Sequence, residues 1–232
     1  MLGIKIGDKH TYNDWGLKWE DVKITLPEPK TYYIDIPGEN GKLDLSEVLT
    51  DEIKFDNRTI TFTLNVDGKY QLWHSAVSKI ASYVHGKKFK IILDTDLYYY
   101  YYGRIKLSTE KSNSTNGTIV LECSVDPYKL ETQEVIEDWL WDTFSFEDGV
   151  IREYKDIIVN GSTDMIDILD IRMPVIPTFI CSAPMHVNRG QISHALVAGT
   201  NKLLDFKFEY GDNHIWFTGN GTVSINFRGG SL

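Results

Sequence analysis

The stretch YYIDIPGENGKLDLSEVLTDEIKFDNRTITFTL, residues 32–64, holds two extended runs joined by a turn signal. The first run alternates, with Tyr33, Asp35 and Pro37 on one side and Tyr32, Ile34 and Ile36 on the other. Pro37–Gly41 has turn composition, and Asn40-Gly41 suits the positive φ angles of a tight reversal. The alternation and the turn together predict a β-hairpin.

The chain continues from this turn into a second strand. Leu43, Leu45 and Val48-Leu49 lead through a polar break into residues 53–55. Residues 59–66 then alternate, and Ile60, Phe62, Leu64 and Val66 share one face. The pattern predicts a long hairpin over about residues 30–64 that feeds a core strand.

Composition sets the broad class of the protein. The 232 residues allow one large domain or two modest ones, and 42% hydrophobic with 25% charged residues is typical of a globular protein. Thirteen Tyr, ten Phe and six Trp favour β structure. The net charge of -9 argues against a nucleic-acid-binding protein that works by neutralising phosphates.

Targeting and cysteine signals are weak. The first residues lack a basic segment followed by an apolar run, so we expect no signal peptide. No stretch reaches the about 18 apolar residues of a membrane helix, so we expect no membrane insertion. Cys123 and Cys181 are far apart in strand-like contexts, which predicts buried free thiols.

One helix is predicted in the N-terminal half, at about residues 70–85. Tyr70, Trp73, Val77, Ile80 and Val84 recur at helical spacing. Gly86 follows and suits the left-handed position at a helix end.

Beyond Ile151 the chain shows short strands with a turn signal every 8–12 residues or so, the pattern of a β-sandwich or barrel. We interpret Gly219-Asn220-Gly221 as a hairpin turn between two of these strands. A phosphate-binding loop is disfavoured because no helix follows.

Catalytic and metal-binding signals are weak. No nucleophile, metalloprotease or nucleotide-binding motif is present. Asp94/Asp96 and Asp164/Asp167 are interpreted as solvated turn acids, although a glycosidase pair stays open. His186 and His194 flank a loop, but no further ligand has suitable spacing. We therefore predict no enzyme, no metal and no cofactor, and find no support for a cell-wall hydrolase.

Aromatic residues leave one alternative function open. Alternate tyrosines of Tyr98–Tyr102 would face opposite sides of a strand, one set against Trp73 and Val77. A packed strand or subunit interface is favoured over a sugar platform. The alternative is a carbohydrate-binding module for host-surface glycans, whose C-terminal sandwich would use aromatic rings. The candidate rings are Trp216, Trp139 and Tyr210.

Over residues 1–130 the chain resembles the siphophage distal tail protein family, called Dit. The resemblance rests on the order and spacing of several segments. They are Trp15-Gly16-Leu17, the run from Asn40 to Glu47, Arg58, Thr61–Leu64, His85-Gly86, Tyr102-Gly103-Arg104 and Asp126-Pro127-Tyr128-Lys129. The last hundred residues match only in β content and length.

The resemblance implies a mainly β protein with two domains. Residues 1–135 would form an N-terminal β-sandwich or split-barrel belt domain that builds a ring, with the hairpin at 30–64 and the helix at 70–85. Residues 136–232 would form a galectin-like β-sandwich.

It also implies a structural hub of a phage tail tip or baseplate. The hub would be a homo-hexamer, as one ring or two stacked rings, in virions assembled from protein made in the bacterial host cytoplasm. It would join the tail tube protein to a tail-associated lysin or tip protein, hold a receptor-binding protein, and let DNA pass through an acidic lumen without specific binding.

The hairpin is the predicted assembly device, because its free edges can add to the sheet of a neighbouring subunit. The predicted interface residues are Tyr33, Asp35, Pro37, Asn40, Gly41, Leu43 and Leu45.

Overall fold

The computed structural model describes residues 2–67, 73–112, 116–137 and 149–232. Strands account for 53% of the described residues and helices for 8%, which confirms the mainly β fold predicted from the sequence. The chain divides into two compact units. The first comprises residues 1–96 and 100–127, and the second residues 97–99 and 128–232.

An antiparallel sheet organises the first unit, in the order β2-β1-β7-β8-β9-β6-β3. Its strands are β1 (Ile4–Ile6), β2 (Lys9–His10), β3 (Lys18–Ile24), β6 (Arg58–Asp67), β7 (Lys88–Leu93), β8 (Asp96–Ser112) and β9 (Asn116–Val125). The first residues of β8 belong to the second unit. The long β6–β9 and β3–β6 pairings run through the centre and one edge of the sheet.

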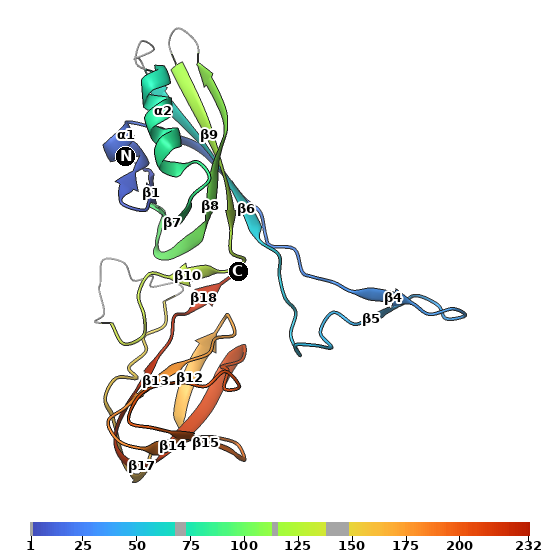
Figure 1. The fold of residues 1–232 in the computed structure, drawn as a ribbon, viewed down its shortest axis with the longest axis vertical. Coiled ribbons are helices and arrows are strands. Elements are labelled where there is room, and N and C mark those ends of the chain that lie inside the picture. Colours follow the sequence, from blue (N-terminus) through green and yellow to red (C-terminus); the bar gives the residue numbers. More distant parts are fainter. Residues whose placement is uncertain (1, 68–72, 113–115, 138–148) are drawn as a thin grey trace. The chain divides into compact units, whose positions relative to one another are not determined.

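The core of the first unit lies on one face of this sheet, where α2 (Trp73–Val84) packs (Figure 1). Ile60, Phe62 and Leu64 are fully buried there, as their alternation predicts. The predicted helix face is confirmed at Trp73, Val77, Ile80 and Val84, all of which are buried. Tyr70 lies outside the described residues. Gly86 has φ +74°, as expected at a helix end.

A second, short helix was not predicted. The sequence around Tyr12–Leu17 indicates an exposed turn, but α1 (Thr11–Trp15) forms there. The His10 Nδ1 atom accepts hydrogen bonds from the backbone N–H groups of Tyr12 and Asn13, and Gly16 ends the helix at φ +67°. The sequence did not indicate this helix because its N-cap is a histidine, which is not one of the residues that commonly cap helices.

The predicted hairpin is present between β3 and β6. β4 (Tyr33–Asp35) and β5 (Lys42–Asp44) form a two-stranded antiparallel sheet of their own. The six residues 36–41 connect them, rather than a tight two-residue turn. Gly38 and Gly41 have φ of +90° and +83°, whereas Asn40 is not in a positive-φ conformation. The glycines therefore make the reversal without Asn40, contrary to our expectation.

The second unit is a set of short strands. They are β10 (Lys129–Glu131), β11 (Ile157–Ser162), β12 (Ile166–Ile171), β13 (Thr178–Cys181), β14 (Met185–Arg189), β15 (Ile192–Leu196), β16 (Gly199–Lys202), β17 (Gly211–Asn226) and β18 (Gly230–Ser231). The order β15-β14-β17-β13-β16 has β11 and β12 paired to β17 as well. Its core is rich in phenylalanine, with Phe179, Phe208 and Phe217 fully buried.

The predicted hairpin turn at Gly219-Asn220-Gly221 is wrong, because β17 continues through it. β14 pairs with β17 up to Gly219, and β13 pairs with it from Val223. A Cβ on Gly219 would lie 2.7 Å from the Met185 Cβ atom, and one on Gly221 2.6 Å from the Ser182 Oγ atom. The glycines therefore allow close approach where β17 changes partners.

Both cysteines are buried free thiols, as predicted. The run Tyr98–Tyr102 lies in β8, and the burial of its side chains alternates along the strand except at Tyr98 and Tyr99. Tyr101 joins the core with Trp73 and Val77, and Tyr102 is exposed. Tyr98 and Tyr99 are both buried, because this short piece of β8 belongs to the second unit.

Candidate assembly interface

The candidate interface of the first unit is formed by the segment between β3 and β6, residues 25–57, which we call the arm. Its base continues the β3–β6 pairing through the backbone hydrogen bond from Thr25 to Thr59, 3.0 Å long. Further out, Pro29 forms a bridge with Phe55, and the Lys30 N–H donates to the Lys54 carbonyl at 2.7 Å. Figure 1 shows β4 and β5 beyond the end of β3 and β6.

Turns within the arm are held by local hydrogen bonds. The Leu45 N–H donates to the Tyr32 carbonyl, and the Tyr32 N–H donates to the Ser46 hydroxyl at 2.8 Å. Asp44 accepts from both the Ser46 hydroxyl and the Ser46 N–H, and these bonds lower the pKa of the Asp44 carboxyl. The arm therefore has defined local structure, although it adds no residue to the buried core of its unit.

Large apolar side chains are exposed along the arm. Leu49 is 95% exposed and Leu26 77%. The others are Tyr32, Tyr33, Ile34, Leu43 and Val48. An isolated two-stranded ribbon is marginally stable in water, and contiguous exposed apolar groups mark interaction surfaces. The arm therefore has the properties of a contact surface for another protein chain.

The register divides the predicted interface residues between two faces. Tyr33 pairs with Asp44 and Asp35 with Lys42, so both lie on a polar face. Leu43 pairs with Ile34 and lies on the opposite, apolar face, where Leu45 follows at the same spacing. Pro37, Asn40 and Gly41 lie in the connection between the strands.

Sequence reasoning missed Tyr32 and Ile34, which share the apolar face with Leu43 and Leu45. The signal was available, because both limbs alternate with a period of two. Matching the residues of one limb to those of the other also required the strand register. This register follows from the six-residue connection 36–41 and not from a tight turn at Asn40-Gly41. Leu26, Val48 and Leu49 were also missed as exposed apolar residues of the same arm.

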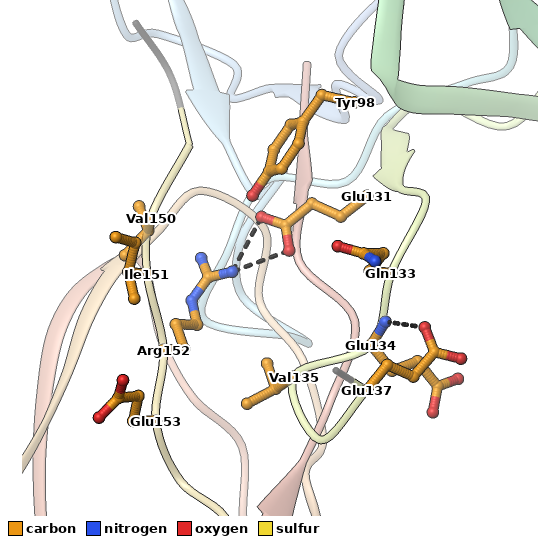
Figure 2. Close-up of a pocket in the computed structure, with 10 residues that line it drawn as sticks. All are labelled: Tyr98, Glu131, Gln133, Glu134, Val135, Glu137, Val150, Ile151, Arg152 and Glu153. Atoms are coloured by element: carbon orange, nitrogen blue, oxygen red, sulfur yellow. Dashed lines mark hydrogen bonds and ion pairs between the residues drawn. The ribbon is translucent and has the colours of Figure 1, made fainter. Parts of the chain in front are cut away.

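A small pocket lies in the second unit (Figure 2). Its lining is Tyr98, Glu131, Gln133, Glu134, Val135, Glu137, Val150, Ile151, Arg152 and Glu153. Its volume of about 110 Å³ is well below the about 300–1,000 Å³ of typical small-molecule sites. The pocket is therefore a poor candidate for a substrate site.

Glu131, Glu134 and Arg152 of the pocket are engaged in structural contacts. One guanidinium nitrogen of Arg152 donates to both Glu131 carboxylate oxygens, at 2.9 and 2.8 Å, and the Arg152 side chain is only 6% exposed. Glu134 binds Asn226 and Arg228, which lowers its pKa. Burial, reinforced by the Glu131 charge, raises the pKa of Tyr98 to about 12. The network ties β10 and residues 150–153 to the C-terminal strand end, and no side chain is poised as a nucleophile.

The other candidate catalytic and metal-binding residues either make structural contacts or lie on opposite faces of a strand pair. Asp94 accepts from the Gly3 N–H at 2.8 Å and contacts His10 Nε2 at 3.0 Å. His186 pairs with Ala195, whereas His194 pairs with Val187. The two imidazoles therefore occupy opposite faces of the β14–β15 pair and cannot share a metal ion.

Among the described residues, no group of three or more His, Cys, Asp or Glu is placed to hold a metal ion. None of the described helices is long and apolar enough to cross a membrane. Asp167, from the other acid pair, contacts His214 at 2.6 Å.

The carbohydrate alternative rests on Trp216, Tyr210 and Trp139. Ile215 and Phe217 are fully buried, so Trp216 is on the other face of that part of β17, between His214 and Thr218. The Tyr210 hydroxyl bonds to the Tyr128 hydroxyl. Trp139 lies outside the described residues.

No protein-family model and no curated protein matches the sequence. The solved structures do give a match: the chain has the fold of a phage hub protein over its full length. One matching crystal structure is that of the SPP1 Dit (gp 19.1) protein, described as a paradigm of the hub adsorption apparatus in phages that infect Gram-positive bacteria. The TM-score is 0.58, the sequence identity 13%, and 100% of each chain is covered. The predicted resemblance to the Dit family is confirmed at the level of the fold.

Proposed function

We propose that this chain is a structural hub of a phage tail tip, assembled as a homo-hexameric ring or two stacked rings. The exposed apolar arm carries this proposal, because it needs a partner that its own unit does not supply. The full-length fold match to a hub protein supports the same role.

A ring follows from a head-to-tail contact between identical subunits. If the arm of each subunit contacts a different surface on the next, the interface is heterologous, and a suitable rotation closes it into a ring. Tyr32, Ile34, Leu43 and Leu45, on one face of β4 and β5, are the side chains that this contact would bury. The other predicted interface residues, Tyr33, Asp35, Pro37, Asn40 and Gly41, would lie at its polar margin.

The two units would have different roles. The first, with its arm, would build the ring as a belt domain, and the second would be a galectin-like sandwich that holds a receptor-binding protein. The ring would join the tail tube protein to a tail-associated lysin or tip protein in the virion, after synthesis in the host cytoplasm. The net charge of -9 would repel DNA that passes through the lumen. We propose no catalytic activity.

Negative-stain electron microscopy of the purified full-length chain tests this function. We expect rings with an open centre and six-fold symmetry. Compact particles of one subunit at micromolar concentration would refute the proposal.

A further inference from the structure

A cationic surface lies on the sheet of the first unit, on the face opposite α2. Lys88 pairs with Arg104 across β7 and β8, and Lys90 pairs with Tyr102. Since directly paired residues point to the same side, these side chains share one face. Tyr100 and Lys106 follow at the same spacing on β8. We call Lys88, Lys90, Tyr100, Tyr102, Arg104 and Lys106 the cationic face.

The direction of this face is fixed by the core. Tyr101 and Ile105 alternate with the residues of the cationic face and are buried in the core cluster with α2. Lys88, Tyr102, Arg104 and Lys106 are exposed.

Aromatic rings and lysines contact each other on the cationic face. The Lys90 ammonium lies 4.2 Å from the centre of the Tyr100 ring, and the Lys88 ammonium 5.9 Å from that of Tyr102. Glu122 of β9 is the acid paired across from Lys106, at 3.8 Å. Four cations and two aromatic rings therefore share this face, in a chain whose net charge is -9.

The arm has the complementary composition. Residues 28–57 contain eight carboxylates and three cations, all of which are lysines. The lysines are Lys30, Lys42 and Lys54, and the acids are Glu28, Asp35, Glu39, Asp44, Glu47, Asp51, Glu52 and Asp56. The same segment exposes the apolar side chains described above. An acidic, apolar ribbon and a basic, aromatic sheet face are matched in charge and in chemistry.

The free edges of the sheet are less suited to receive the arm. β2 has two residues, which is too short to template a strand. β3, at the other edge, has a register irregularity between Trp19 and Asp21 and exposes Glu20, Asp21 and Lys23. Bulges and charges are the devices by which edge strands avoid pairing with other chains.

We propose that the arm of one copy docks on the cationic face of the next copy. Ile34 and Leu43 lie against Tyr100 and Tyr102, and Glu28, Glu39 and Glu47, which lie outside the β4–β5 pairs, are beside Lys88, Lys90 and Arg104 at the margins of this contact. This inference rests on the proposed ring, and it names the surface that receives the arm.

The test uses two full-length variants that reverse charge on one side of the contact. The face variant is Lys88→Glu with Arg104→Glu. The arm variant is Glu28→Lys, Glu39→Lys and Glu47→Lys, which reverses the sign of the net charge of the arm. We expect each variant alone to lose assembly, with a dissociation constant raised by about tenfold or more per reversed charge. Lys79→Glu with Lys202→Glu is the control, because both lysines are exposed and lie off this face.

Mixing the two variants in equal amounts is the decisive step. The basic arm of the arm variant then meets the acidic face of the face variant, and the normal arm of the face variant meets the normal face of the arm variant, so we expect assembly to return in alternating complexes. Light scattering measures the mass of each sample, and circular dichroism checks that each variant is folded. If the face variant fails to fold, Lys88→Ser with Lys106→Ser replaces it and should weaken assembly without restoring it in the mixture.

The outcomes separate the two proposals. If the unaltered chain does not assemble, the proposed function fails and this inference falls with it. If it assembles and the face variant assembles equally well, the arm docks elsewhere and only this inference is overturned. Loss in both variants without recovery in the mixture also overturns direct contact. Binding of a short DNA duplex that the face variant loses, with assembly intact, would assign the face to nucleic acid instead.

Discussion

Removing the outer arm should separate assembly from folding. The change replaces residues 31–53 with Asn-Gly, so that the chain reverses directly after the Lys30–Lys54 hydrogen bond. The deleted segment contains no residue of the buried core, so little burial is lost with it. Its exposed apolar groups, which we expect to be covered in the ring, are lost entirely.

The effect on stability can be worked from the structure. The loop between β3 and β6 shortens from about 33 to about 12 residues, which lowers its closure entropy cost by about 0.9 kcal/mol. The lost local hydrogen bonds of the arm are exposed and contribute little. The free energy of unfolding of the first unit should therefore change by less than about 1 kcal/mol. Phe62→Ala, at a fully buried position, is the matched contrast and should cost about 3–5 kcal/mol.

Urea denaturation followed by tryptophan fluorescence measures stability, and light scattering measures assembly. We expect the shortened chain to be monomeric and, at a concentration low enough to dissociate the unaltered chain, as stable as that chain, whereas Phe62→Ala should be destabilised. Rings that survive the deletion would refute the role of the arm. A loss of more than about 2 kcal/mol would show that the arm belongs to the fold.

Three further predictions concern the structural contacts. Arg152→Ala should destabilise the second unit by about 3–5 kcal/mol in urea denaturation, because it leaves the buried Glu131 carboxylate unpaired. Glu153→Gln, at an exposed neighbour, should change stability by less than about 0.5 kcal/mol, and equal effects would contradict the reasoning. Burial raises the pKa of the Cys123 thiol to about 12, so in a Cys181→Ser background it should react with Ellman's reagent at pH 8 only after unfolding; fast native reaction would show that the thiol is accessible. Hydrogen bonds from Asn226 and Arg228 hold the pKa of Glu134 below its ordinary value of 4.5, so its stabilisation is present above that pH and is lost as the pH falls through the lower folded-state pKa. The Glu134→Gln variant should lose this part of the acid dependence of the unfolding midpoint, and an unchanged profile would count against it.

Sequence periodicity predicted the elements whose buried face can be recognised within one short stretch of residues. The face of α2 and the core face of β6 were both identified from spacing, because burial on one side selects one period. The continuation of β17 through Gly219–Gly221 was not predicted, since a glycine signals either a reversal or a close approach. The proximity of Met185 and Ser182, which is set by tertiary packing, decides between them.

The candidate interface was predicted only in part for a similar reason. The sequence located the hairpin, but the pairing of Ile34 with Leu43 depends on the length of the connection between the strands. The cationic face was invisible in the sequence, because Lys88 and Arg104 are brought together by the β7–β8 register. The charges of the cationic face and of the arm could be counted from the sequence, but their positions in space could not be predicted from it.

The mass of the purified full-length chain in solution tests the central claim most directly. Size-exclusion chromatography with multi-angle light scattering should give six or twelve times the mass of one chain at micromolar concentration. A mass equal to one chain across that range would contradict the account of this protein as a ring-forming tail hub.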